Sequence, residues 1–242
     1  MNTGPAKTGP LRLAELPWPE AERLGANGAL LVLPVGSTEQ HGPHLPLSTD
    51  TLVATALAEG LGAARPDVVV APTLAYAASG EHSEFPGTVS IGLEALEAVL
   101  VEWGRSATAT FAHLVFVNGH GGNAAALAAA AARLEVEARP TLAWSPRWAG
   151  DAHAGLVETS LLLALHPSLV RLDLAVAGNQ TPLADLMPDL RAGRLRTISP
   201  SGVLGDPGGA SAEYGSALVE ALTADLLSAV DAWRPRNAPR TR

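Results

Sequence analysis

The stretch Ala29-Leu-Leu-Val-Leu-Pro-Val35 is an apolar run without polar interruption, and it decides the fold class. A strand buried on both faces of a parallel sheet has this pattern, whereas a half-exposed strand alternates apolar and polar residues. Three further short apolar runs are separated by helical patterns, and they cover residues 68–71, 113–117 and 141–144. The order of these patterns predicts an α/β protein with a mostly parallel central sheet.

Helical spacing accounts for most of the remaining chain, at residues 50–61, 93–111, 124–136, 156–165 and 211–233. The segment 172–210 is less regular, and we expect edge strands there at 174–176 and 197–198.

We expect a single domain over residues 16–233. The flanking segments are a Pro/Gly-rich N-terminus over residues 1–15 and a tail over 234–242 with four arginines and no acidic residue. Both are expected to be flexible, because neither has an apolar pattern that could pack against a core.

The chain of 242 residues has no cysteine and a formal net charge of −8. Disulfides, thiolate nucleophiles and Cys-ligated metal sites are therefore excluded, and any metal must bind nitrogen and oxygen ligands. The negative charge argues against a broad nucleic-acid surface. We find neither an apolar run of membrane-spanning length nor a signal peptide, and we expect a cytoplasmic protein without membrane contact.

Two carboxylates and two imidazoles follow the first strand within the segment Glu39-Gln-His-Gly-Pro-His-Leu-Pro-Leu-Ser-Thr-Asp50. These ligand types suit Zn, Mn or Fe(II), and an extended backbone points Glu39 and His41 to the same side. Glu and His also occur together by chance on solvated loops. However, this segment begins where open α/β sheets bind ligands, beyond the carboxyl end of a strand, which favours a metal site and hydrolysis.

A second polar segment, Asn118-Gly-His-Gly-Gly-Asn123, follows the strand at 113–117. It could be a phosphate-binding loop, but it lacks the GxGxxG and GxxxxGK[ST] spacings and has no lysine. It could also be a glycine turn with an incidental histidine. We favour a tight turn that brings His120 to the same crevice as Glu39 and His41.

A third cluster contains His153 and Glu158 at the start of the helix at 156–165. Glu158 stands among apolar residues, and an inward-facing carboxylate needs a partner such as a metal ion or an arginine. His153 could transfer a proton or bind a substrate carboxylate, or it could be an ordinary surface histidine.

Together, these three motifs resemble those of the creatininase (creatinine amidohydrolase) family of metal-dependent amidohydrolases, over about residues 20–230. The resemblance implies a three-layer α/β/α sandwich, a homo-oligomer and two divalent metal ions per subunit (Zn, Fe(II) or Mn). In that arrangement Glu39 and His120 would bind one metal ion, His41 would bind the other, and Asp50 would bridge both.

The chain departs from creatininase at Gly122, where creatininase has a glutamate that binds the second metal. We expect Glu158 to replace that ligand, as in family branches with the His-Gly-Gly-Asn form of the motif. We expect His44 to support the site by hydrogen-bonding a ligand carboxylate rather than to bind metal.

Within the family, the chain is most similar to the branch of the mycofactocin biosynthetic system, a peptidase that releases the modified C-terminal Val-Tyr-derived dipeptide from a precursor peptide. The segments that carry this similarity are 79–88, 150–155 and 201–209. A water shared by the two metal ions would attack the amide. His153 is our candidate proton donor to the leaving amine, with Glu158 as the fallback should it not be a metal ligand. The loop 76–88 would contact substrate through Tyr76, Ser79, Glu81 and His82.

Two alternatives remain open at this point. The first is another reaction of the same family, hydrolysis of creatinine or of a formamide in flavin or deazaflavin biosynthesis. The second is a non-catalytic α/β protein that binds a small molecule and uses its histidines structurally.

Overall fold

The computed structural model of the protein describes the backbone of residues 9–237 and the side chains of residues 9–233. Its centre is a parallel sheet of five strands in the order β1-β3-β2-β4-β5. The strands are β1 (Leu11–Arg12), β2 (Leu30–Val35), β3 (Val68–Val70), β4 (His113–Asn118) and β5 (Thr141–Trp144). The four apolar runs of the sequence thus form β2 to β5, as predicted.

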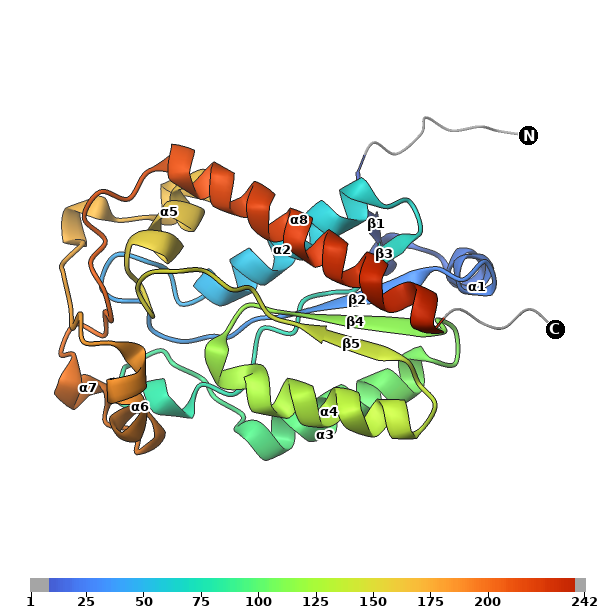
Figure 1. Ribbon diagram of the computed structural model, residues 1–242, viewed down its shortest axis with the longest axis horizontal. Helices are drawn as coiled ribbons and strands as arrows, with labels where there is room; N and C mark the ends of the chain where they lie inside the picture. The colour runs from blue at the N-terminus through green and yellow to red at the C-terminus, as the bar shows by residue number, and fades with distance from the viewer. Residues whose placement is uncertain (1–8, 238–242) are drawn as a thin grey trace.

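Helices cover both faces of this sheet, which confirms the three-layer α/β/α sandwich (Figure 1). One face packs against α2 (Thr49–Ala64), α5 (Leu156–Leu165) and α8 (Ala212–Asn237), and the other packs against α3 (Leu93–Ala107) and α4 (Ala124–Val136). Successive residues of β2 enter opposite cores, because strand side chains alternate between faces. Leu30 and Val32 join the first core, and Leu31 and Leu33 join the second. This explains why the β2 sequence is apolar throughout.

The order of the strands positions the site. β2 pairs with β3 on one side and with β4 on the other, so the chain reverses direction across the sheet at β2. In open parallel sheets, ligands bind outside the carboxyl ends of the strands at such a switch point. The two motifs that follow β2 and β4 are therefore brought to one crevice.

The N-terminal region differs from the prediction. We expected residues 11–15 to be flexible, but they form β1 and the 3-10 turn η1 (Leu13–Glu15). Leu11 pairs with Val69 of β3, and its side chain packs against the core. The unpaired edge of β3 accepts a strand too short to give a pattern of its own. Residues 18–26, for which we made no prediction of secondary structure, form α1 (Trp18–Ala26).

The C-terminal prediction also needs correction, because α8 continues to Asn237, whereas we expected a flexible tail from residue 234. The rest of that tail, and residues 1–8, lie outside the described part of the chain. The helix predicted over 93–111 ends at Ala107, and a turn precedes β4.

The expected edge strands in the segment 172–210 are wrong. Residues 172–174 form a 3-10 turn, η5 (Leu172–Leu174), and residues 197–198 belong to a one-turn helix, α7 (Leu195–Ile198), which follows α6 (Leu183–Arg191). Leu186 and Leu195 pack with Leu204 and the Phe85 ring in a small separate cluster. This cluster buries the apolar residues without any sheet pairing. Within residues 9–237, no helix is both long and apolar enough to cross a membrane.

Candidate metal centre

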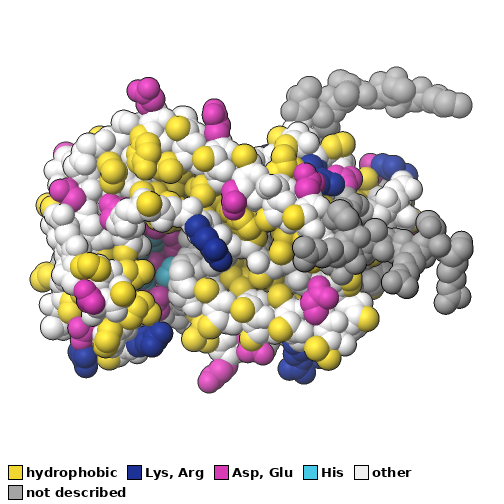
Figure 2. Space-filling model, in the orientation of Figure 1, with side chains coloured by type: hydrophobic (Ala, Val, Ile, Leu, Met, Phe, Trp, Pro, Cys, Tyr) yellow, Lys and Arg dark blue, Asp and Glu magenta, His cyan; other side chains and the backbone are white. Residues whose placement is uncertain are grey.

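The five predicted metal ligands lie together beyond the carboxyl ends of β2 and β4, although they come from three distant segments. All are buried, with exposed fractions of at most 7%. They are Glu39, His41, Asp50, His120 and Glu158. Figure 2 shows histidine and acidic side chains at the bottom of a hollow beside the lobe that contains α6 and α7.

Three groups of side chains in the described part of the chain could hold a metal ion, and two of them share Asp50, while the third joins Glu39 and His41 with His153. Of the two that share it, Glu39, Asp50 and His120 make one group, and His41, Asp50 and Glu158 make the other, with the atoms of each group within 4.8 Å of one another. The two oxygens of Asp50 face different histidines: Oδ1 lies 3.1 Å from His41 Nε2, and Oδ2 lies 3.2 Å from His120 Nδ1. This arrangement matches a carboxylate that bridges two cations.

The hydrogen bonds of the two histidines leave lone pairs directed at these carboxylates. His41 Nδ1 lies 3.2 Å from the carbonyl oxygen of Glu39, and His120 Nε2 lies 3.0 Å from that of Ala78. Carbonyl oxygens only accept hydrogen bonds, so these nitrogens carry the protons of the neutral rings. The opposite nitrogens, His41 Nε2 and His120 Nδ1, face Asp50, and the contact is stable when either a proton or a metal ion lies between nitrogen and oxygen.

Burial makes this set of charges costly without a cation. Neither carboxylate oxygen of Glu39 has a hydrogen-bond partner, and burial raises the pKa of Glu39 to about 8. Burial likewise raises the pKa of Glu158 to about 7. Burial lowers the pKa of His41, but the charges of Asp50 and Glu158 outweigh it and raise that pKa to about 10. Positive charge in the pocket would therefore stabilise the buried carboxylates, and the carboxylate and imidazole donors suit divalent Zn, Mn or Fe(II).

Two glycines let the ligand-bearing segments approach closely. A Cβ at Gly36 would lie 2.4 Å from the Cα of Thr51, and a Cβ at Gly119 would lie 2.3 Å from the carbonyl oxygen of Asp50. The Ser37 hydroxyl donates to Asp50 Oδ2 at 2.7 Å. The first turn of α2 is thus held against both strand ends.

The turn that carries His120 is closed by its flanking asparagines. Asn118 Oδ1 accepts from the backbone N–H of His120, and Asn118 Nδ2 donates to the carbonyl oxygen of His120 at 2.7 Å. Asn123 donates to the carbonyl oxygen of Gly36 at 2.9 Å. This segment is a structural turn that presents His120, as the sequence favoured.

The segment before α5 places Glu158. Asp151 accepts from the backbone N–H groups of Leu156 and Val157 and so caps the helix. Ala154 has a positive φ of 53°, and its N–H donates to Glu158 Oε2 at 2.6 Å. A locally strained residue therefore fixes the orientation of the Glu158 carboxylate.

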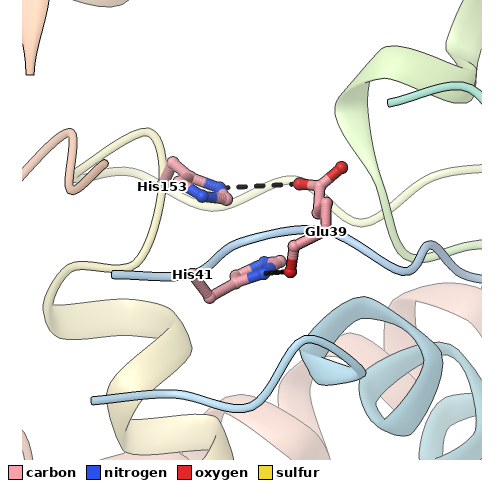
Figure 3. Close-up of side chains that lie close together, drawn as sticks. All are labelled: Glu39, His41 and His153. Atoms are coloured by element: carbon pink, nitrogen blue, oxygen red, sulfur yellow. Dashed lines mark hydrogen bonds and ion pairs between the residues drawn. The ribbon is translucent and has the colours of Figure 1, made fainter. Parts of the chain in front are cut away.

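His153 lies over the same pocket, with its ring centroid 4.3 Å from that of His41. Its Nε2 donates to the carbonyl oxygen of Gln40 at 2.8 Å. Its Nδ1 lies 3.9 Å from both Glu39 Oε1 and Glu158 Oε2, and Figure 3 shows this nitrogen facing the Glu39 carboxylate. Burial and the neighbouring His41 hold the pKa of His153 well below its usual value. It is a neutral imidazole with a free lone pair, suited to proton transfer.

Of the expected substrate-binding residues, two lie directly against the ligands. His82 Nε2 lies 3.2 Å from Glu39 Oε1, and Glu81 Oε1 lies 3.2 Å from His120 Nε2. Ser79 is fully buried, and Tyr76 is 54% exposed. Contact of any of the four with substrate remains a prediction.

The expected partner of His44 is wrong. Its Nε2 lies 2.9 Å from the hydroxyl oxygen of Thr159, not from a ligand carboxylate. The turn that follows His41 directs this ring towards α5, where Thr159 follows Glu158. His44 therefore braces the helix that carries a ligand.

Sequence reasoning missed Gln40 and Ser37, which are both buried in the site. A signal for Gln40 existed, because an amide between two candidate ligands is a natural hydrogen-bonding partner for neighbouring imidazoles. Ser37 gave no distinct signal, since its contact depends on the packing of α2.

Comparisons with known proteins find relatives over most of the chain. The family model described as "Creatininase: Creatinine amidohydrolase" matches residues 14–230. A "Mycofactocin precursor peptide peptidase" of Mycolicibacterium smegmatis is 51% identical over 213 residues, which cover 85% of this chain and 86% of the relative. The "Creatinine amidohydrolase" of Pseudomonas putida is 30% identical over 260 residues, covering 90% of this chain and 95% of that protein.

Solved structures of similar fold include some whose descriptions name a metal. A structure described as "Creatininase Mn" has a TM-score of 0.79 and 29% identity, and covers 93% of this chain and 100% of that chain. A mutant creatininase of "Zn-Zn type" has a TM-score of 0.77 and 29% identity, with 93% and 98% covered. The protein is a hydrolase of amide bonds that binds divalent metal, and its chain belongs to the creatininase family.

Proposed function

We propose that this protein is a peptidase that releases the modified C-terminal Val-Tyr-derived dipeptide from the mycofactocin precursor peptide. The observation that carries an amide-hydrolysing reaction is the pair of ligand groups that share Asp50. The relatives named as mycofactocin precursor peptide peptidases, with identities of 46–51%, support this substrate.

We further propose that each subunit binds two divalent ions. Glu39 and His120 would hold one, His41 and Glu158 the other, and Asp50 both. Glu158 thereby supplies the ligand that is missing at Gly122, and its carboxylate lies 3.8 Å from His41 Nε2. Zn, Fe(II) and Mn all accept these donors, and structural relatives named for Mn and Zn support this range.

The chemistry needs a stronger nucleophile and a more electrophilic carbonyl than a free amide and water provide. Bound divalent ions would supply both, by lowering the pKa of water and by polarising the scissile carbonyl. His153 would accept at Nδ1, which faces the pocket, the proton that the attacking water loses, and would deliver it to the leaving amine nitrogen. Its Nε2 stays protonated, because Gln40 accepts from it. Glu158 is the alternative proton carrier only in the case that it does not bind metal.

Peptide cleavage followed by mass spectrometry tests this function. The metal-loaded protein is incubated separately with the precursor peptide carrying the modified Val-Tyr end, with creatinine and with a formamido-pyrimidine. We expect release of the dipeptide and no turnover of the other two substrates. Turnover of creatinine alone would show that the protein keeps the activity named for its Pseudomonas putida relative.

The same preparation addresses the other predictions. A homo-oligomer is expected to elute from size-exclusion chromatography at a multiple of the 24.8 kDa chain mass.

Metal analysis of the purified protein tests the metal-dependent mechanism. A protein that contained no transition metal after purification, and lost neither activity nor stability with a chelator, would contradict that mechanism.

A further inference from the structure

Gln40 stands between the ligands Glu39 and His41, and only its backbone carbonyl oxygen has a role in the mechanism described above. Its side chain is 5% exposed. Its Oε1 accepts from the backbone N–H of Gly42 at 2.8 Å. This contact fixes which end of the amide is the oxygen, so the amide nitrogen must face the opposite side.

That nitrogen, Nε2, has two hydrogens and three neighbours within hydrogen-bond distance. They are the Gly202 carbonyl oxygen at 3.1 Å, His82 Nδ1 at 2.9 Å and His153 Nε2 at 3.0 Å. His153 Nε2 already donates to the Gln40 carbonyl oxygen, so it carries a hydrogen and cannot accept another. The two amide hydrogens therefore go to Gly202 and to His82 Nδ1.

The consequence is a fixed tautomer for His82. A neutral imidazole that accepts at Nδ1 must carry its hydrogen on Nε2. His82 Nε2 lies 3.2 Å from Glu39 Oε1. The N–H of His82 is thereby turned towards the ligand carboxylate instead of a lone pair, which would repel it.

The surroundings leave the amide no freedom to rotate. Gly202 has a positive φ of 81°, and a Cβ there would lie 1.9 Å from Gln40 Oε1. The loop at Gly202 thus closes directly over the side chain, and the next residues pair with His153 through Leu204.

We propose that Gln40 is a positioning residue that fixes the tautomer of His82 and, through it, the orientation of Glu39. The role of Glu39 as a metal ligand rests on the proposed function, but the tautomer of His82 does not. Removing an outer partner of a metal ligand typically costs about 10–100-fold in metal affinity or activity.

The test is the isosteric variant Gln40→Glu, in which a carboxylate oxygen replaces the amide nitrogen. At a pH where this carboxylate is ionised, it accepts from His82 Nδ1, which leaves the Nε2 lone pair facing Glu39. Long-range proton–nitrogen NMR of the metal-free protein distinguishes the two tautomers, and the chain has only seven histidines to assign. His153 is an internal reference, because its Nε2–H keeps the backbone acceptor.

We expect His82 to change from the Nε2–H to the Nδ1–H form in Gln40→Glu, while His153 stays unchanged. Zinc affinity, measured by competition with a chromogenic chelator, should fall by about 10–100-fold. Gln180→Glu makes the same chemical change at an exposed position and should alter neither quantity. Gln40→Met, which has no donor, should populate both tautomers of His82 and serves if the charged variant does not fold.

An unchanged His82 tautomer in Gln40→Glu would overturn the proposal, as would a changed tautomer with parental zinc affinity. These results are separable from failure of the proposed function. A parent protein that bound no metal or cleaved no peptide would contradict that function, while the NMR comparison would still decide the role of Gln40 in setting the tautomer.

Discussion

At the scale of single residues, the site depends on one shared carboxylate. Asp50 belongs to both ligand groups, and it receives the Ser37 hydroxyl as well as facing two histidines. Asp50→Ala is expected to remove both metal ions together, because each group is left with two ligands. Metal content by mass spectrometry of the native protein measures this, with Asp173→Ala as the control for loss of an exposed carboxylate. Normal occupancy of one ion would argue against the bridging role.

Neighbouring side chains leave no room for a side chain at Gly122. A Cβ at this position would lie 2.3 Å from His120 Nε2 and 2.4 Å from Glu81 Oε1. Gly122→Ala should therefore displace the His120 ring and weaken metal binding by about 10-fold or more, an effect of the size seen when ligand orientation is lost. Gly121→Ala is the matched control, since nothing lies within 4 Å of a Cβ there. Equal zinc affinity in the two variants would show that His120 tolerates the added atom.

At the scale of elements, α5 is positioned by its cap. Asp151 bonds two N–H groups of the first turn, and a Cβ at Gly155 or Gly205 would overlap its side chain. Asp151→Ala is expected to cost about 1 kcal/mol of unfolding free energy, as for other lost caps. It should also lower kcat, because His153 and Glu158 flank the cap. The control Asp206→Ala removes a carboxylate that caps the exposed turn at Gly208. A stability loss with unchanged kcat would mean that α5 keeps its place without the cap.

The elements also show where sequence reasoning succeeds and fails. β2 and the ligand motif after it are contiguous, so apolar continuity and residue spacing predicted both the strand and Glu39 with His41. β1 and the segment from α6 to α7 are different, because each is stabilised by contacts with remote segments. The same holds for His44, whose partner Thr159 is 115 residues away. Local pattern carries no information about such partners.

At the scale of the whole molecule, the buried site couples folding to pH and to metal. In the metal-free protein, the pKa of Glu39 is raised to about 8 mainly by burial. Burial lowers the pKa of His41, but Asp50 raises it to about 10 overall. Both groups therefore bind more protons in the folded than in the unfolded state between pH 6.5 and about 8. The metal-free protein should lose stability as pH rises through this window.

The histidines with lowered pKa do not reverse that trend. Burial lowers the pKa of His82 to about 3, so below pH 6.5 the folded state binds fewer protons at this ring than the unfolded state does. The resulting gain in stability with rising pH is complete above about pH 6.5. His153 is lowered in the same direction. Above pH 6.5, the raised groups alone set the slope.

Metal ions should remove this pH dependence, because they replace the protons as the positive charge in the pocket. The expected outcome is a difference in melting temperature between zinc-loaded and chelator-treated protein that widens from pH 6.5 to about 8, as ligands lose their competing protons. Differential scanning calorimetry at a fixed metal concentration measures it, and a weakly buffered titration should show protons released on zinc binding. A difference that stays constant or narrows as pH rises would mean that the ligands are already deprotonated in the metal-free fold. The raised pKa values of Glu39 and His41 would then not describe the protein in solution.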